Sequence, residues 1–247
     1  MAATSRPYPV MTAFGPGTPP RRPRILVVRP DHLGDVVVTL PAVAALRSAV
    51  PGAVVTYAAS PPAAEACRRC PHLDHVIAVA FPGPGRAWGA FADAELRAAV
   101  AALGGPYDLA VLARPDDPAS GTLCAAAGVP VRIGFATPQT LPFLTRALPP
   151  PAPGLSVAET TGRLLAAALA ELGAPGALPP LPARDGTIVP TAADRAEAAA
   201  VLAEAGVPDP EVVLHPGSGW PVKNWPPARW GLVARRLRGR LRFPALV

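Results

Sequence analysis

The segment "ILVVRPDHLGDVVVTLPAVAALR", residues 25–47, decides the fold expected for this chain. It opens with a short β-branched run, turns through a polar loop and continues into an Ala/Leu-rich stretch with apolar residues at helical spacing. The helix expected over 35–49 stops at the Pro-Gly pair 51–52. A strand followed directly by a helix is the repeating unit of parallel α/β sheets.

The same alternation continues along the chain, which predicts an α/β protein built from βαβ units around parallel sheets. Strands are expected at 25–29, 53–59, 75–80, 107–113, 131–135 and 211–215. Helices are expected at 35–49, 62–69, 91–103, 118–127, 156–172, 192–205 and 227–238.

Composition shifts suggest four segments. Residues 1–23 are expected to form a flexible tail, because they lack any apolar periodicity. Residues 24–172 form a first Rossmann-like domain, and the Pro/Gly-rich stretch 173–191 is a linker. Residues 192–247 then read as the start of a second α/β domain.

The overall composition indicates a globular protein with anionic partners. Half of the residues are apolar and 16% are charged, so a substantial core can form. The net charge of +6 favours ligands such as phosphates, nucleic acid or an acidic membrane face. Three cysteines without framework spacing fit a reducing compartment better than secretion, and no apolar run reaches the roughly 20 residues of a membrane span. We expect a soluble protein, at most peripheral to a membrane.

The first strand-to-helix turn, "RPDHLGD" at 29–35, holds the first candidate site. Ligands of open parallel sheets bind beyond the carboxyl ends of the strands. Asp35 could act there as a general base, with Asp31 and His32 as weaker assistants, and Gly34 would allow a sharp turn. The alternative for Asp35 is a helix N-cap that satisfies free amides, a common role for aspartate.

A second turn, "HPGSGWPVKNWPP" at 215–227, follows the last expected strand. Gly217 and Gly219 flank Ser218, so backbone amides and a hydroxyl could converge on an anion. Lys223, the single lysine of the chain beside 22 arginines, adds a positive charge. The order of residues is not that of a P-loop, and an ordinary glycine-rich loop with a surface lysine is the alternative.

Other motifs carry less chemistry. Cys67, Cys70, His72 and His75 are all metal-binding types, but their spacing is too compressed for a zinc finger, so a helix end entering a strand is the favoured interpretation and no metal site is expected. The arginines of 234–242 are more typical of a solvated face than of a nucleic-acid site. No dinucleotide fingerprint follows the first strand, which disfavours an NAD enzyme.

Together, the two turns resemble the two signature regions of glycosyltransferase family 9, which includes the ADP-heptose:lipopolysaccharide heptosyltransferases. The first region is "RPDHLGDVVVTLPAVAALR", matched through Arg29, Asp31, Gly34, Asp35 and Pro41. The second is "HPGSGWPVKNWPPARWGLVARRL", matched through His215, Pro216, Gly217, Ser218, Gly219, Lys223, Trp225 and Pro226.

The resemblance implies a GT-B architecture, in which two Rossmann-like domains bind acceptor and nucleotide sugar, and inverting transfer without a metal ion or cofactor. Asp35 would deprotonate the acceptor hydroxyl, on a loop shared with Asp31, His32 and Gly34. Gly217, Ser218, Gly219 and Lys223 would hold the donor diphosphate. ADP-heptose is the donor by family default, and the acceptor would be lipid-linked or a glycan, reached in the cytoplasm or at the inner membrane face; no nucleic-acid partner is expected.

The sequence departs from the family after residue 238, where about four further strand-helix units would complete a Rossmann-like half. A truncated or frameshifted gene is one hypothesis for this incomplete second domain. The alternative to an active glycosyltransferase is therefore a remnant or binding module that keeps the fold without turnover.

Overall fold

The structure is a computed structural model that describes residues 22–82, 91–174, 188–206, 209–210, 212–218 and 221–238. The chain divides into two compact units, Met1–Val189 and Pro190–Val247, each of which is described by itself below. We refer to them as unit 1 and unit 2.

Unit 1 is a six-stranded parallel sheet with the order β3-β2-β1-β4-β5-β6. The strands are β1 (Arg24–Arg29), β2 (Val54–Ala59), β3 (His75–Ala78), β4 (Leu109–Leu112), β5 (Val131–Phe135) and β6 (Arg146–Leu148). The helices are α1 (Leu33–Val37), α2 (Leu40–Ala49), α3 (Pro61–Cys67), α4 (Asp93–Leu103), α5 (Pro118–Ala126) and α6 (Val157–Glu171), with a 3-10 turn η1 (Leu141–Phe143).

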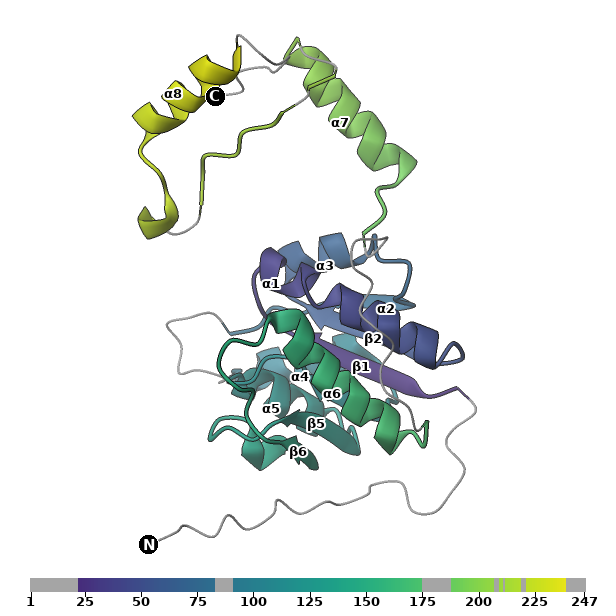
Figure 1. Cartoon of the computed structure of the whole chain (residues 1–247). Coiled ribbons are helices and arrows are strands. Elements are labelled where there is room, and N and C mark those ends of the chain that lie inside the picture. Colours follow the sequence, from purple (N-terminus) through teal and green to yellow (C-terminus); the bar gives the residue numbers. More distant parts are fainter. Residues whose placement is uncertain are drawn as a thin grey trace, which may run out of the picture. The chain divides into compact units, whose positions relative to one another are not determined.

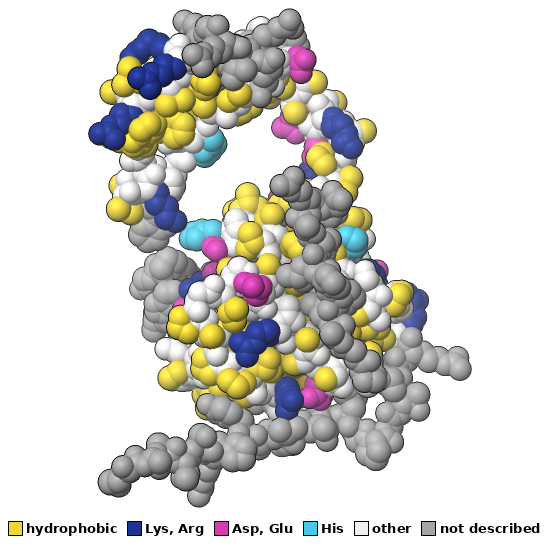
Figure 2. All heavy atoms as spheres, in the orientation of Figure 1, with side chains coloured by type: hydrophobic (Ala, Val, Ile, Leu, Met, Phe, Trp, Pro, Cys, Tyr) yellow, Lys and Arg dark blue, Asp and Glu magenta, His cyan; other side chains and the backbone are white. Residues whose placement is uncertain are grey.

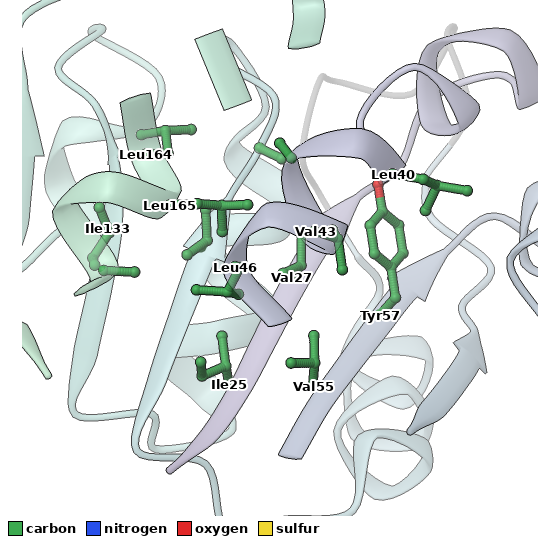
Figure 3. Packing of buried hydrophobic residues seen from close by; sticks show 14 of the residues in the cluster. Ile25, Val27, Leu40, Val43, Leu46, Val55, Tyr57, Ile133, Leu164 and Leu165 are labelled. Atoms are coloured by element: carbon green, nitrogen blue, oxygen red, sulfur yellow. The ribbon is translucent and has the colours of Figure 1, made fainter. Parts of the chain in front are cut away.

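Helices cover both faces of this sheet. One face packs against α2, α3 and α6, and the other against α4 and α5. Figure 1 shows α2 and α6 crossing the same side of the sheet. The strands are apolar on both faces because both are covered, as in doubly wound folds. In Figure 3, Val43 and Leu46 of α2 lie with Leu165 of α6 over Ile25, Val27 and Val55.

The expected α/β class and most expected elements are confirmed, and apart from shifts of a few residues at element ends unit 1 shows two differences. The single helix expected over 35–49 is two helices, because Pro41 has no N–H to donate to the carbonyl of Val37. At the break between them, the Thr39 hydroxyl donates to Val36 O at 2.7 Å. β6 was not expected, since "RAL" is only three residues long and stands among prolines.

Unit 2 contains α7 (Ala192–Glu204), the 3-10 turn η2 (Pro221–Lys223) and α8 (Pro227–Arg238). The strand expected at 211–215 is wrong for the residues described, because 212–218 have no regular secondary structure. The described residues of unit 2 include no strand, so among them 212–214 have no strand with which to pair their backbone N–H and C=O groups.

Candidate functional site

The candidate site of unit 1 lies at the carboxyl ends of β1 and β4. These strands are neighbours in the sheet although two strands, β2 and β3, separate them in sequence, so the chain reverses its direction of winding between them. Such a switch point leaves a crevice between diverging loops, where ligands of open α/β sheets bind. The loops that meet there are 30–32 and 113–117.

Four charged side chains, from the end of β1 and from these loops, form a connected cluster. Asp31 accepts from Arg29 at 2.7 Å through one carboxylate oxygen and from Arg114 at 2.6 Å through the other. Arg29 also donates to the carbonyl of Ala113 at 2.6 Å, and Arg114 pairs with the exposed Asp116 at 2.9 Å. The cluster therefore ties the loop after β1 to the loop after β4.

Asp31 is the buried centre of this cluster, with only 10% of its side chain exposed. Burial raises the pKa of its carboxyl above the ordinary value, while the guanidinium groups of Arg29 and Arg114 oppose that rise. Its backbone carbonyl accepts from the Ser60 hydroxyl at 3.0 Å, which adds a tie to the end of β2. Both carboxylate oxygens are thus engaged by the protein.

Asp35 occupies the third position of α1 and is exposed. The alternative of Asp35 as N-cap is wrong, because His32 holds that position, without a side-chain capping hydrogen bond. Gly34 lies inside α1 without a positive φ, so the turn does not require glycine there, and a Cβ at Gly34 would meet nothing within 4 Å. The carboxylate of Asp35 is therefore presented to solvent at the switch-point edge, without an ion pair in the described part of the chain.

A buried hydroxyl pair supports the turn that carries Asp35. The Tyr57 hydroxyl, at the end of a fully buried ring, lies 2.7 Å from the Thr39 hydroxyl, which itself bonds to Val36 O. Figure 3 shows the Tyr57 hydroxyl pointing toward the start of α2. Since Val36 follows Asp35 directly, this chain of contacts anchors α1 to β2.

The second candidate turn lies in unit 2. Gly217 and Ser218 are exposed in a segment without regular structure, and Lys223 is exposed at the end of η2. Gly219 lies outside the described residues. A Cβ at Gly217 would meet nothing within 4 Å, so the backbone there is open to an approaching ligand.

Aromatic contacts fix the helix that follows this turn. Trp225 and Trp230 pack edge to face with ring centroids 5.6 Å apart, and the guanidinium of Arg229 lies 5.8 Å from the Trp225 centroid. Figure 2 shows basic side chains beside hydrophobic ones over α8.

The cysteine-histidine stretch behaves as a helix end entering a strand, as expected. α3 ends at Cys67 and β3 begins at His75. Cys67 and Cys70 are buried in the core, and burial raises the pKa of the Cys67 thiol to about 12, which is unlike the thiolate that a zinc ion binds. Among the described residues no group of three metal-binding side chains is present.

Sequence reasoning missed Arg114 and Asp116. Their signal was available in "LARPDD", 112–117, because charged residues directly after a fully apolar strand mark the ligand-binding edge of a parallel sheet. What the sequence alone did not provide was the neighbourhood of β1 and β4, which lie about 80 residues apart in the chain.

This sheet order and its charged switch point define the Rossmann-like class of α/β proteins. Residues 96–241 match glycosyltransferase family 9 (heptosyltransferase), and this match spans more than half of the chain, so the chain belongs to that family. The match includes the second signature region and begins after the first. No curated protein sequence matches the chain.

Solved structures agree on the fold. A family 9 glycosyltransferase from Veillonella parvula has a TM-score of 0.69 at 22% identity, over 89% of this chain and 61% of that one. E. coli heptosyltransferase WaaC with ADP-2-deoxy-2-fluoro heptose has a TM-score of 0.61 at 23% identity, over 87% of this chain and 65% of that one. E. coli ADP-heptose lps heptosyltransferase II has a TM-score of 0.63 at 17% identity, over 88% of this chain and 62% of that one. The expected GT-B fold class is confirmed, and the chain spans less than two thirds of the length of these structures.

None of the helices in the described part of the chain has the length and apolar character needed to cross a bilayer.

Proposed function

We propose that the protein is an inverting, metal-independent glycosyltransferase that moves a sugar from a nucleotide-diphosphate donor to a hydroxyl of a lipopolysaccharide-type or other glycan or lipid acceptor. The observation that carries this proposal is an exposed carboxylate, Asp35, at the switch-point edge of a family 9 fold. ADP-heptose is the favoured donor, because a heptosyltransferase of the same fold was solved with an ADP-heptose analogue.

Asp35 is the proposed general base. Its carboxylate takes the proton of the acceptor hydroxyl while the hydroxyl oxygen forms a bond to the anomeric carbon of the donor sugar. The bond from that carbon to the diphosphate oxygen breaks on the opposite face, so the configuration inverts and a nucleoside diphosphate leaves. A positioned base of this kind contributes about 100- to 10,000-fold to a rate.

The surroundings of Asp35 favour it over Asp31 for this task. Both oxygens of Asp31 are held by guanidinium groups, whereas Asp35 is exposed. Asp31 serves better to hold the two loops in place. In this proposal Asp31, His32 and Gly34 form the acceptor-side loop.

The donor diphosphate is assigned to the second turn. Gly217, Ser218 and Gly219 would supply amides and a hydroxyl, and the ammonium of Lys223 would stabilise the negative charge that develops on the leaving phosphate. Lys223 is exposed, and a mobile cation of this kind does the work that a metal ion performs in other transferases.

A lipid-linked acceptor would bring the protein to the cytoplasmic face of the inner membrane. The net charge of +6 suits contact with anionic headgroups and with a phosphate-bearing donor. This localisation is part of the proposal and is tested by binding of the chain to vesicles with and without anionic lipid.

The decisive experiment measures donor-dependent transfer by the intact chain, with ADP-heptose and a lipid-linked or glycan acceptor, by release of ADP and by mass of the product. Asp35→Asn is expected to lower the turnover at least 100-fold with little change in donor affinity.

Asp93→Asn is the matched control, because Asp93 is another exposed carboxylate in the first turn of a helix, α4. Its turnover should equal that of the unaltered chain. If Asp35→Asn and the unaltered chain had equal turnover, Asp35 would not be the general base. Donor binding without transfer by the unaltered chain would instead identify a binding module.

A further inference from the structure

A cavity of about 550 Å³ lies at the amino ends of the strands of unit 1, at the edge opposite to Asp31 and Asp35. Arg24, which begins β1, and His75, which begins β3, both line it. At about 3.3 Å per residue, β1 places the two edges roughly 17 Å apart. The cavity is therefore separate from the proposed catalytic edge, and its volume is within the range of small-molecule sites, about 300–1,000 Å³.

Arg24 gives this cavity its charge. Its guanidinium lies 5.9 Å from the ring centroid of Tyr107, which also lines the cavity. The guanidinium makes no hydrogen bond or ion pair to any residue that the structure describes, and its Nε is buried without a partner. A buried donor without a partner costs free energy that a bound acceptor would recover.

The other charged residues of the lining are already paired. Arg68 pairs with Glu65 at 2.5 Å. Asp74 pairs with Arg47 and accepts from the backbone N–H of Val55.

Asp108, which lies near the cavity, accepts from the backbone N–H of Arg24 at 2.7 Å and forms no ion pair with its guanidinium. In the described lining, the positive charge of Arg24 is thus the one without a carboxylate partner.

Part of the remaining wall is apolar. Leu73, Val76, Ile77 and Leu103 line the cavity, and each packs against one of the two hydrophobic clusters of the sheet. A ligand that fills the cavity would bury an apolar body against these side chains, at about 25 cal/mol per Å² of apolar surface.

We propose that this cavity binds a small organic anion, a carboxylate or phosphate joined to an apolar body, with Arg24 as the anion-recognising residue. The guanidinium, held against the Tyr107 ring, can present two N–H groups to two oxygens of the anion. The apolar part of the ligand packs against the Leu103 side of the cavity.

Titration of the intact chain with phenyl phosphate, followed by calorimetry and by amide chemical shifts, tests this proposal. We expect saturable binding that perturbs the amide shifts of residues in the cavity. Benzyl alcohol, which lacks the anion, and inorganic phosphate, which lacks the apolar body, should each bind at least tenfold more weakly. Arg24→Gln should weaken binding of phenyl phosphate at least tenfold, and Arg24→Lys should weaken it less.

Arg163→Gln is the matched control, because the Arg163 guanidinium also lies over an aromatic ring, Phe135 at 5.6 Å, and does not line the cavity. It should bind as the unaltered chain does, and urea unfolding will verify that each variant is folded.

Phenyl phosphate binding that persists in Arg24→Gln, or an unaltered chain that binds no phenyl phosphate, would overturn the proposal. Asp35→Asn should leave this binding intact, so the result is independent of whether the chain transfers a sugar.

Discussion

At the scale of single residues, the fold changes the proton affinity of Asp31. Burial raises its pKa, so the folded chain holds this proton more tightly than the unfolded chain. The carboxyl therefore contributes most to stability below its ordinary pKa, and this contribution is lost as the pH rises through the folded-state value. Arg114→Gln removes one opposing guanidinium and should raise that pKa further.

We expect Arg114→Gln to lower the free energy of unfolding by about 2 kcal/mol at pH 7 and by much less at pH 3, where Asp31 is protonated in both states. Urea unfolding between pH 3 and pH 8 measures this. Asp116→Asn, which removes only the exposed partner of Arg114, should cost less than about 1 kcal/mol. A penalty for Arg114→Gln that is constant with pH, or that persists in Asp31→Asn/Arg114→Gln, would show that Asp31 is not its source.

Tyr57 is the residue that connects stability with the proposed base. Tyr57→Phe removes the bond to Thr39 and leaves the Thr39 hydroxyl with its bond to Val36 O, so a loss of about 1 kcal/mol in unfolding free energy is expected. If Asp35 is the base, looser anchoring of α1 should also lower kcat severalfold with KM unchanged.

Tyr107→Phe is the comparison for this prediction, because its hydroxyl donates to Leu103 O at 2.5 Å near the amino edge of the sheet. It should cost similar stability and leave kcat unchanged. Equal effects of the two substitutions on kcat would remove the positioning role of Tyr57.

At the scale of elements, the contact between α5 and η1 depends on a glycine. A Cβ at Gly121 would lie 2.6 Å from Cδ2 of Phe143, which is far inside van der Waals contact. Gly121→Ala should therefore destabilise unit 1 by about 1–3 kcal/mol in thermal or urea unfolding, although alanine is the better helix former. In the double variant Gly121→Ala/Phe143→Ala the clash is absent, so its loss of stability should be smaller than the sum of the losses of the two single variants. Losses that simply add would contradict the clash.

The elements that sequence predicts well are those whose own residues decide them. β5 was expected at its observed bounds, because "VRIGF" is β-branched and stands between a Gly-Val-Pro turn and a polar loop. The break between α1 and α2 depends on Thr39 bonding to Val36 O and to Tyr57, a partner from another element. The wrong strand at 211–215 and the unpredicted ion pair of Arg114 with Asp31 have the same origin, since pairing and proximity between distant segments leave no local pattern.

At the scale of the whole molecule, the two units differ in how much they bury. Both hydrophobic clusters of the described residues lie entirely within unit 1. In unit 2, α7 has no buried residue. Unit 2 instead exposes large apolar side chains, among them Val213 at 70% and Val222 at 90%. Such exposed apolar surface favours association, so we expect copies of the chain to associate as the concentration rises.

This difference predicts that residues 1–189 alone fold with the same free energy of unfolding as unit 1 has in the full chain, because the sheet and its helices obtain their packing from within that segment. Urea unfolding followed by circular dichroism should give coincident main transitions for the two proteins. Light scattering should show the full chain associating at concentrations where 1–189 is monomeric, and Val213→Lys/Val222→Lys in the full chain should reduce that association. A main transition shifted by more than about 1 kcal/mol would mean that unit 2 stabilises the sheet, and a monomeric full chain at high concentration would contradict the expected association.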